Sequence, residues 1–136
     1  MRVFLSATLD DLEALRESGR IRSLLAGFAA TPPLVDRLGL EGEELDLALA
    51  LAAADGSRDA AIDSGLAVGR RLVIVAELPE GDVRVESESE GEVSLPEGVD
   101  MRRVDAFLAD AVPLELAVAD REELAWFGAQ ELDLLT

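Results

Sequence analysis

Hydrophobic residues follow two different spacings along this 136-residue sequence. In some stretches they form short runs or occupy every second position, which is typical of β-strands. In others they recur every third or fourth position, which is typical of helices. The run LVIVAEL over residues 72–78 is the clearest strand, because it is rich in β-branched residues and lies between Gly69 and Pro79. Further strands are predicted over residues 2–7, around 83–85, around 93–95 and over 102–109.

A helix is predicted directly after the first strand. Thr8 and Asp11 have the spacing of a capping box, in which two side chains satisfy free backbone N–H groups at a helix start. Leucines recur at helical spacing beyond them, and Gly19 supplies a stop. Residues 20–29 are predicted to form a second helical piece, because their larger apolar side chains fall on one side of a helix.

Two more helices are predicted before residue 70. Thr31 precedes two prolines and is expected to cap a short helix over 34–38. The segment 41–54 is composed almost entirely of Glu, Leu, Ala and Asp, which favours a long helix. Its Leu/Ala part is apolar nearly all round, so we expect deep burial. Residues 55–57 are expected to interrupt this helix, with a second half over 58–67.

The C-terminal quarter completes the order of elements. Residues 110–119 are predicted to form a helix, and 123–132 a strand or a helix. Without the acidic hairpin around Gly91, the order is β-α-β-β-α-β, which is typical of ferredoxin-like sandwiches. We therefore expect one α+β domain over 1–136, with a mostly antiparallel sheet, helices on one face and an inserted acidic hairpin.

Composition then removes much of the available chemistry. The chain has no histidine and no cysteine, and all 12 of its basic residues are arginine. Nucleophilic triads that depend on histidine, Schiff-base lysines and ordinary zinc sites are therefore excluded. Carboxylates, arginines, hydroxyls and backbone groups remain. This disfavours an enzyme, and neither a catalytic residue nor a cofactor is predicted.

Charge and hydropathy narrow the partners. With 29 acidic and 12 basic residues, the formal net charge is −17. Such a charge disfavours direct binding to nucleic acid or to anionic lipid, and favours basic partners or simply solubility. No signal peptide and no membrane span is apparent, so the expected location is the cytoplasm.

An acidic repeat in the hairpin is the sharpest motif. Glu86, Glu88 and Glu90 alternate before Gly91, and Glu97 lies eleven residues after the first of them. An EF-hand loop places calcium ligands at these intervals, so the four glutamates are a candidate site for a divalent cation. Glutamate is longer than the Asp or Asn usual at the first positions, and the flanks are predicted strands. The alternative is a solvated hairpin that protects a sheet edge.

Two arginine doublets stand out in a chain that is poor in basic residues. Arg70-Arg71 and Arg102-Arg103 both fall at predicted strand starts. Together they are a candidate site for an anion or a carboxylate. The alternative is surface pairing with the acidic excess.

The last 15 residues hold the only tryptophan, in the doublet Trp126-Phe127. Exposed aromatic residues often anchor protein interfaces. Gln130 and Glu131 would add polar contacts, so these four residues are the candidate partner-binding surface. The alternative is ordinary core packing of the two rings.

Several short motifs resemble a family of small uncharacterised actinobacterial proteins. The resemblance rests on Met-Arg-Val-Phe-Leu at the start, Phe-Ala-x-Thr-Pro at 28–32, a valine-rich strand at 71–76 and Trp-Phe-x-x-Gln-Glu-Leu at 126–132. It spans nearly the whole chain, and the middle, over 79–100, departs most. Phenylalanine stands at positions 4 and 127 where the family is associated with tyrosine. The resemblance implies no known activity.

The sequence thus favours a non-enzymatic binding or interaction module with a protein partner, with homodimerisation as one form of it. A divalent-metal-binding protein or a carboxylate-dependent enzyme that uses 86–97 is the main alternative. A DNA mimic, which would occupy a basic nucleic-acid-binding protein, is a weaker one.

Overall fold

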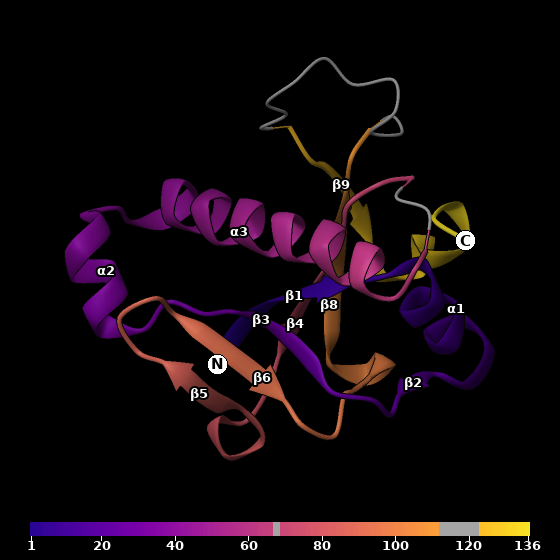
Figure 1. The fold of residues 1–136 in the computed structure, drawn as a ribbon, viewed down its shortest axis with the longest axis horizontal. Coiled ribbons are helices and arrows are strands. Elements are labelled where there is room, and N and C mark those ends of the chain that lie inside the picture. Colours follow the sequence, from indigo (N-terminus) through magenta and orange to yellow (C-terminus); the bar gives the residue numbers. More distant parts are fainter. Residues whose placement is uncertain (67–68, 112–122) are drawn as a thin grey trace.

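The computed structural model describes residues 1–66, 69–111 and 123–136. Its main feature is a seven-stranded antiparallel sheet in the order β5-β6-β3-β1-β4-β8-β9, beside a separate two-stranded sheet, β2-β7 (Figure 1). The strands of the large sheet are β1 (Arg2–Ala7), β3 (Leu25–Phe28), β4 (Leu72–Glu77), β5 (Arg84–Ser87), β6 (Glu92–Leu95), β8 (Val104–Ala109) and β9 (Ala125–Gly128), and those of the small one are β2 (Arg20–Ile21) and β7 (Val99–Asp100). The predicted α+β class with a mostly antiparallel sheet is confirmed.

Three α-helices are described, α1 (Leu9–Ser18), α2 (Pro32–Leu38) and α3 (Gly42–Asp63), with 3₁₀ turns η1 (Glu80–Asp82), η2 (Met101–Arg103) and η4 (Ala129–Leu134). The predicted capping box at the start of α1 is confirmed. The Thr8 N–H donates to Asp11 Oδ2 over 2.9 Å, and the Asp11 N–H donates to Thr8 Oγ1 over 3.4 Å. Gly19 ends α1 in the left-handed region, at a φ of 74°. Among the described helices, none is both long and apolar enough to cross a bilayer.

Both faces of the central strands are covered, so the expectation of helices on one face alone is wrong. Side chains alternate across a strand. Phe4 and Val75 accordingly join a cluster under α3, whereas Leu5 and Ile74 join a second cluster that includes Leu12 of α1. The sheet therefore lies between α3 on one side and α1 with the C-terminal turn η4 on the other (Figure 1).

The strand order also differs from the ferredoxin-like order that was expected. A ferredoxin-like order would place another strand between β1 and β4, but these two strands are antiparallel neighbours, and β8 and β9 follow β4 in the sheet, with β1 at the other side of β4. A split β-α-β unit does exist around it. Both β3 and β4 are antiparallel to β1, so they run parallel to each other with β1 between them, and α3 crosses from one to the other.

The strand that makes this unit was predicted as helix. Residues 20–29 hold β2 and β3 instead, because tertiary pairing outweighs a helical period in a ten-residue segment. Gly27 explains the close approach, since a Cβ at this position would overlap the carbonyl oxygen of Phe4 on β1. In β3 the burial alternates, with Leu25 and Gly27 inward and Ala26 outward, which is the period of a strand.

The long helix α3 is continuous, so the predicted interruption at 55–57 is wrong. Gly56 faces Ser6 of β1, where a Cβ would overlap the Ser6 hydroxyl. Ser57 is buried and its Oγ donates to the Ala7 carbonyl over 2.5 Å while accepting from the Leu72 N–H over 2.9 Å. The two residues that resemble a break are therefore the contact between helix and sheet.

The remaining predictions agree in part. The short helix capped by Thr31 is present as α2, although the Thr31 hydroxyl donates to the Glu88 carbonyl rather than to the helix start. The strand predicted over 102–109 begins at Val104, after η2. The segment 123–132 is a strand followed by a 3₁₀ turn. Most of the helix predicted over 110–119 lies outside the described residues.

Candidate functional site

The four glutamates of the hairpin do not converge. Glu86 lies on β5, where its carboxylate accepts from Ser94 Oγ of β6 over 2.7 Å. Glu90 forms an ion pair with Arg37 of α2, with 3.3 Å between nitrogen and oxygen. Glu88 and Glu97 are exposed. Over the described ranges, no three acidic side chains form a group that could hold a metal ion.

The turn of this hairpin packs against the start of α2. The carbonyl of Glu88 accepts from the Thr31 hydroxyl over 2.5 Å, and the carbonyl of Gly91 accepts from the Ala29 N–H over 2.9 Å. Gly91 has a φ of 72°, and a Cβ there would overlap Leu34. The glutamates thus flank a turn that packs against the start of α2.

Trp126 is exposed at an edge of the large sheet. It belongs to β9, which forms one edge of the large sheet, and it pairs in register with Leu108 of β8. Its side chain keeps 65% of its surface accessible to solvent. An exposed tryptophan leaves a large apolar area in water, so this position has the property that the sequence prediction required.

The other three predicted partner residues differ among themselves. Phe127 points to the opposite face of β9, where it packs against the core that includes Phe107. Glu131 accepts from the Gly128 N–H over 2.9 Å and so caps the 3₁₀ turn. Gln130 is exposed. The structure therefore leaves Trp126 and Gln130 available at the surface, and uses Phe127 and Glu131 internally.

A groove beside Trp126 extends the apolar surface; we call it the Trp126 groove. It lies between α3 and the strands β1, β4, β8 and β9, and has a volume of about 240 Å³. Its lining residues include Phe4, Ala50, Val75, Leu108 and Leu124. Leu47 of α3 forms part of the wall and is 48% exposed. The sequence predicted that Leu47 would be buried, because deep burial was expected for the whole apolar run of α3.

Two charged residues, Arg2 and Asp46, line the groove. Arg2 lies over the Phe4 ring, with 5.9 Å between the guanidinium carbon and the ring centre, and it approaches Asp46 to 3.5 Å. Glu123 is exposed just before β9. The groove thus has an apolar floor and charged groups at its margin, which is the usual layout of a protein-binding surface.

The two arginine doublets do not share one site. Arg71 is buried and forms an ion pair with Asp110, which is completely buried, at 2.9 Å, and with Asp55 of α3 at 3.0 Å. Hydrogen bonding to Asp110 is the main reason that the pKa of Arg71 is raised, against the opposing effect of burial. This network was missed from the sequence, because neither acid is close to Arg71 along the chain.

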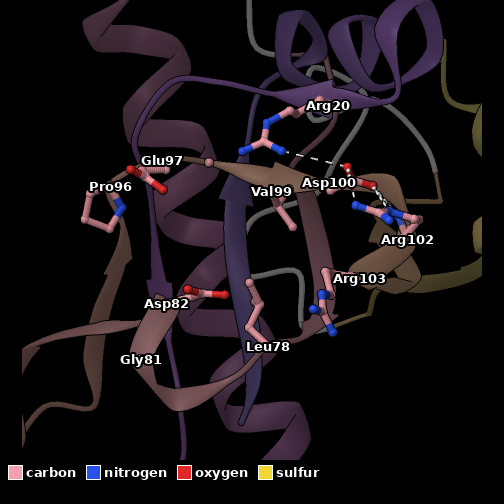
Figure 2. Close-up of a pocket in the computed structure, with 11 residues that line it drawn as sticks. Arg20, Leu78, Gly81, Asp82, Pro96, Glu97, Val99, Asp100, Arg102 and Arg103 are labelled. Atoms are coloured by element: carbon pink, nitrogen blue, oxygen red, sulfur yellow. Dashed lines mark hydrogen bonds and ion pairs between the residues drawn. The ribbon is translucent and has the colours of Figure 1, made fainter.

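Arg102 and Arg103 line a different cavity of about 440 Å³, together with Arg20 and Asp82 (Figure 2). We call it the charged cavity. Its walls come from η1, η2 and the small sheet β2-β7. The lining of this cavity offers arginine and carboxylate side chains to a ligand, whereas the lining of the Trp126 groove is mostly apolar.

The chain matches a protein family described from sequence. A family model described as "Family of unknown function (DUF6912)" matches residues 1–136. No curated protein and no solved structure matches the chain.

Proposed function

Since the chain belongs to the family of unknown function DUF6912, its role has to be inferred from its own surface, and we propose that it is a non-enzymatic interaction module. Its partner is a protein with a basic surface, which inserts an apolar side chain into the Trp126 groove. The single observation that carries this proposal is the 65% exposure of Trp126 at the edge of the sheet.

The apolar area around Trp126 supports the insertion step. Leu47 and Trp126 are both large and exposed, and they flank a groove that is lined by Phe4 and by small and aliphatic side chains. Interface energy is concentrated in a few aromatic and apolar residues that exclude water from their surroundings. A groove of this size suits one side chain of a partner rather than a whole metabolite.

The charge of the chain supports a basic partner. The net charge is −17, and Asp46 and Glu123 lie at or near the groove. Complementary charge raises the association rate and penalises wrong partners. Two copies of the chain that met through this groove would bring like charges together, so the proposal favours a different protein over a homodimer. It also places the interaction in the cytoplasm, in line with a sequence without cysteines.

Affinity capture with three forms of the protein tests the proposal. The bait proteins are the wild type, Trp126→Ala and a control, Leu134→Ala. Leu134 is 66% exposed and lies on η4, outside the groove, so the control removes a comparably exposed apolar side chain. We expect a basic protein that the wild type and the control retain and that Trp126→Ala loses.

Direct titration then has to confirm the capture. The purified partner should shift the emission of Trp126, which is the only tryptophan of the chain, and the affinity should fall as salt rises. Equal retention by all three baits would refute the proposal. Light scattering that gives a dimer for the wild type and a monomer for Trp126→Ala would also refute it, because the groove would then be a self-interface.

A further inference from the structure

The charged cavity has the size and composition of a small-molecule site. Its volume of about 440 Å³ lies within the range of ligand pockets. Three of the twelve arginines of the chain, Arg20, Arg102 and Arg103, line it. Three carboxylates, Asp82, Glu97 and Asp100, line it as well. Both signs of charge therefore meet in one depression of a strongly acidic protein (Figure 2).

Asp100 is already engaged by the protein. Its carboxylate accepts from the Arg102 N–H over 2.9 Å and from Arg102 Nε over 3.1 Å, and it lies 3.9 Å from Arg20. The backbone hydrogen bond from Arg102 is the main reason that the pKa of Asp100 is lowered. Asp100 thus holds Arg20 and Arg102 in place at one side of the cavity (Figure 2).

Three other charged groups of the cavity have no such partner. Within residues 1–66, 69–111 and 123–136, the side chains of Arg103, Asp82 and Glu97 make no ion pair and no hydrogen bond. In Figure 2, Asp82 reaches toward the middle of the cavity from one wall and Arg103 lies at the other. Asp82 and Arg103 form no ion pair with each other, and Leu78 lies between them in Figure 2, so a ligand that lies over Leu78 can contact both charged groups.

We propose that the charged cavity binds a small zwitterion of the amino-acid type. The ligand's carboxylate lies against Arg103, and its ammonium group lies on the opposite side of the cavity, where Asp82 and Glu97 stand (Figure 2). Guanidinium groups recognise carboxylates through paired, charge-assisted hydrogen bonds. Leu78 and Val99, which are buried beneath the cavity, provide an apolar surface for the body of the ligand.

Ligands with a single charge fit this cavity less well. A simple anion would satisfy Arg103 but would meet Asp82 and Glu97 and the negative field of the whole chain. A simple cation would be attracted by that field but would be repelled by Arg103. Only a ligand with both charges pairs all three groups at once.

Three small molecules with the same branched alkyl body test this requirement. L-leucine is the zwitterion, isocaproate lacks its ammonium group, and isoamylamine lacks its carboxylate. Each is titrated to millimolar concentration into the ¹⁵N-labelled full chain. We expect saturable shifts of the backbone amides of residues 97–103 and of Asp82 with L-leucine, and none with isocaproate or isoamylamine.

Charge-removing variants separate the two ends of the ligand. Arg103→Gln and Asp82→Asn should each weaken L-leucine binding about tenfold, which is the loss expected for one charge-assisted hydrogen bond. Both side chains are exposed, so the variants should fold. The control is Arg58→Gln, which removes an exposed arginine on α3, outside the cavity, and should bind like the wild type.

Three results would overturn the proposal. The first is the absence of saturable shifts at the cavity with L-leucine and also with L-glutamate and L-arginine, which carry the same zwitterionic group on other side chains. The second is equal binding of isocaproate, because the cavity would then be an anion site. The third is unchanged affinity in both charge variants. None of these results bears on the Trp126 groove, so the two proposals fail separately.

Discussion

Asp110 is the charged residue whose removal should cost the most stability. Its carboxylate is completely buried and accepts from the Arg71 backbone N–H over 2.8 Å and from the Arg71 guanidinium at 2.9 Å. Replacing Asp110 with alanine leaves the Arg71 charge buried with its main partner gone. We expect Asp110→Ala to lower the free energy of unfolding by about 3–5 kcal/mol, as found when one partner of a buried ion pair is removed.

Urea unfolding followed by circular dichroism measures this loss. The control is Arg58→Gln, because the Arg58–Asp59 pair is exposed and spans 4.0 Å. Exposed pairs contribute little, so the control should stay within about 1 kcal/mol of the wild type. A similar midpoint for Asp110→Ala and the control would contradict the importance of the buried pair.

Asp100 allows a pH prediction at the same scale. Its folded-state pKa is lowered, chiefly by the backbone N–H of Arg102 and then by the Arg102 side chain. A carboxylate with a lowered pKa stabilises the fold above its unfolded-state pKa, and this contribution is lost as the pH falls through the folded-state pKa. An NMR titration should therefore find the pKa of Asp100 below that of an ordinary aspartate.

The variant Arg102→Gln separates the two causes. It keeps the backbone N–H and removes the guanidinium, so the pKa of Asp100 should rise only part of the way to its ordinary value. The Arg58→Gln chain should leave the titration unchanged. A full return to the ordinary value in Arg102→Gln would show that the guanidinium, and not the backbone, holds the charge.

At the scale of elements, local signals were sufficient where the chain determines its own conformation. The capping box of Thr8 and Asp11, the left-handed stop at Gly19 and the run over 72–78 all depend on neighbours in sequence, and all were predicted. The prediction for residues 20–29 was wrong because β3 forms by pairing with β1 and β6. This long-range pairing leaves no local period in the sequence. Because β3 was not predicted as a strand, the predicted order of strands in the sheet was wrong as well.

The candidate sites show the same limit. Trp126 could be identified because aromatic residues are rare in this chain. Leu47 could not, because the sequence alone does not show which part of the apolar run of α3 packs against the sheet. The EF-hand spacing of the glutamates was a pattern without its structural context, because strands and not helices flank the loop. The charged cavity joins residues from positions 20 to 103, so spacing alone gives no sign of it.

Ser57 links the long helix to the sheet and supports a prediction at this scale. Its hydroxyl satisfies the Ala7 carbonyl and the Leu72 N–H at once, at a position that is 3% exposed. Ser57→Ala leaves these two buried backbone groups without that partner. We expect it to lower the free energy of unfolding by about 1–3 kcal/mol, although alanine is the better helix former.

Thermal and urea unfolding of Ser57→Ala test this link. Ser89→Ala is the matched control, because Ser89 is an exposed serine in the hairpin turn and its loss should change stability by less than about 0.5 kcal/mol. A Ser57→Ala protein as stable as the wild type, or more stable, would mean that helix propensity outweighs the contact with β1 and β4.

At the scale of the whole molecule, the charge of −17 is divided between specific pairs and unpaired surface. Within the described residues, six arginines form ion pairs with acids, so half of the twelve basic residues pair with named carboxylates. The large excess of acids is left to repel itself across the surface. This repulsion opposes the compact state and is screened by salt, whose Debye length is about 10 Å at 0.1 M.

The fold should therefore become more stable as sodium chloride is added to a low-salt buffer at neutral pH. We expect a gain of about 1 kcal/mol on reaching physiological ionic strength, or roughly 4 °C in Tm for a chain of this length. The variant Glu88→Gln/Glu92→Gln removes two exposed charges of the hairpin and should show a smaller gain from the same salt, because less repulsion remains to be screened. Differential scanning calorimetry of both proteins across a salt series measures the difference. A Tm that falls with salt would mean that the surface ion pairs stabilise the fold more than the acidic excess destabilises it.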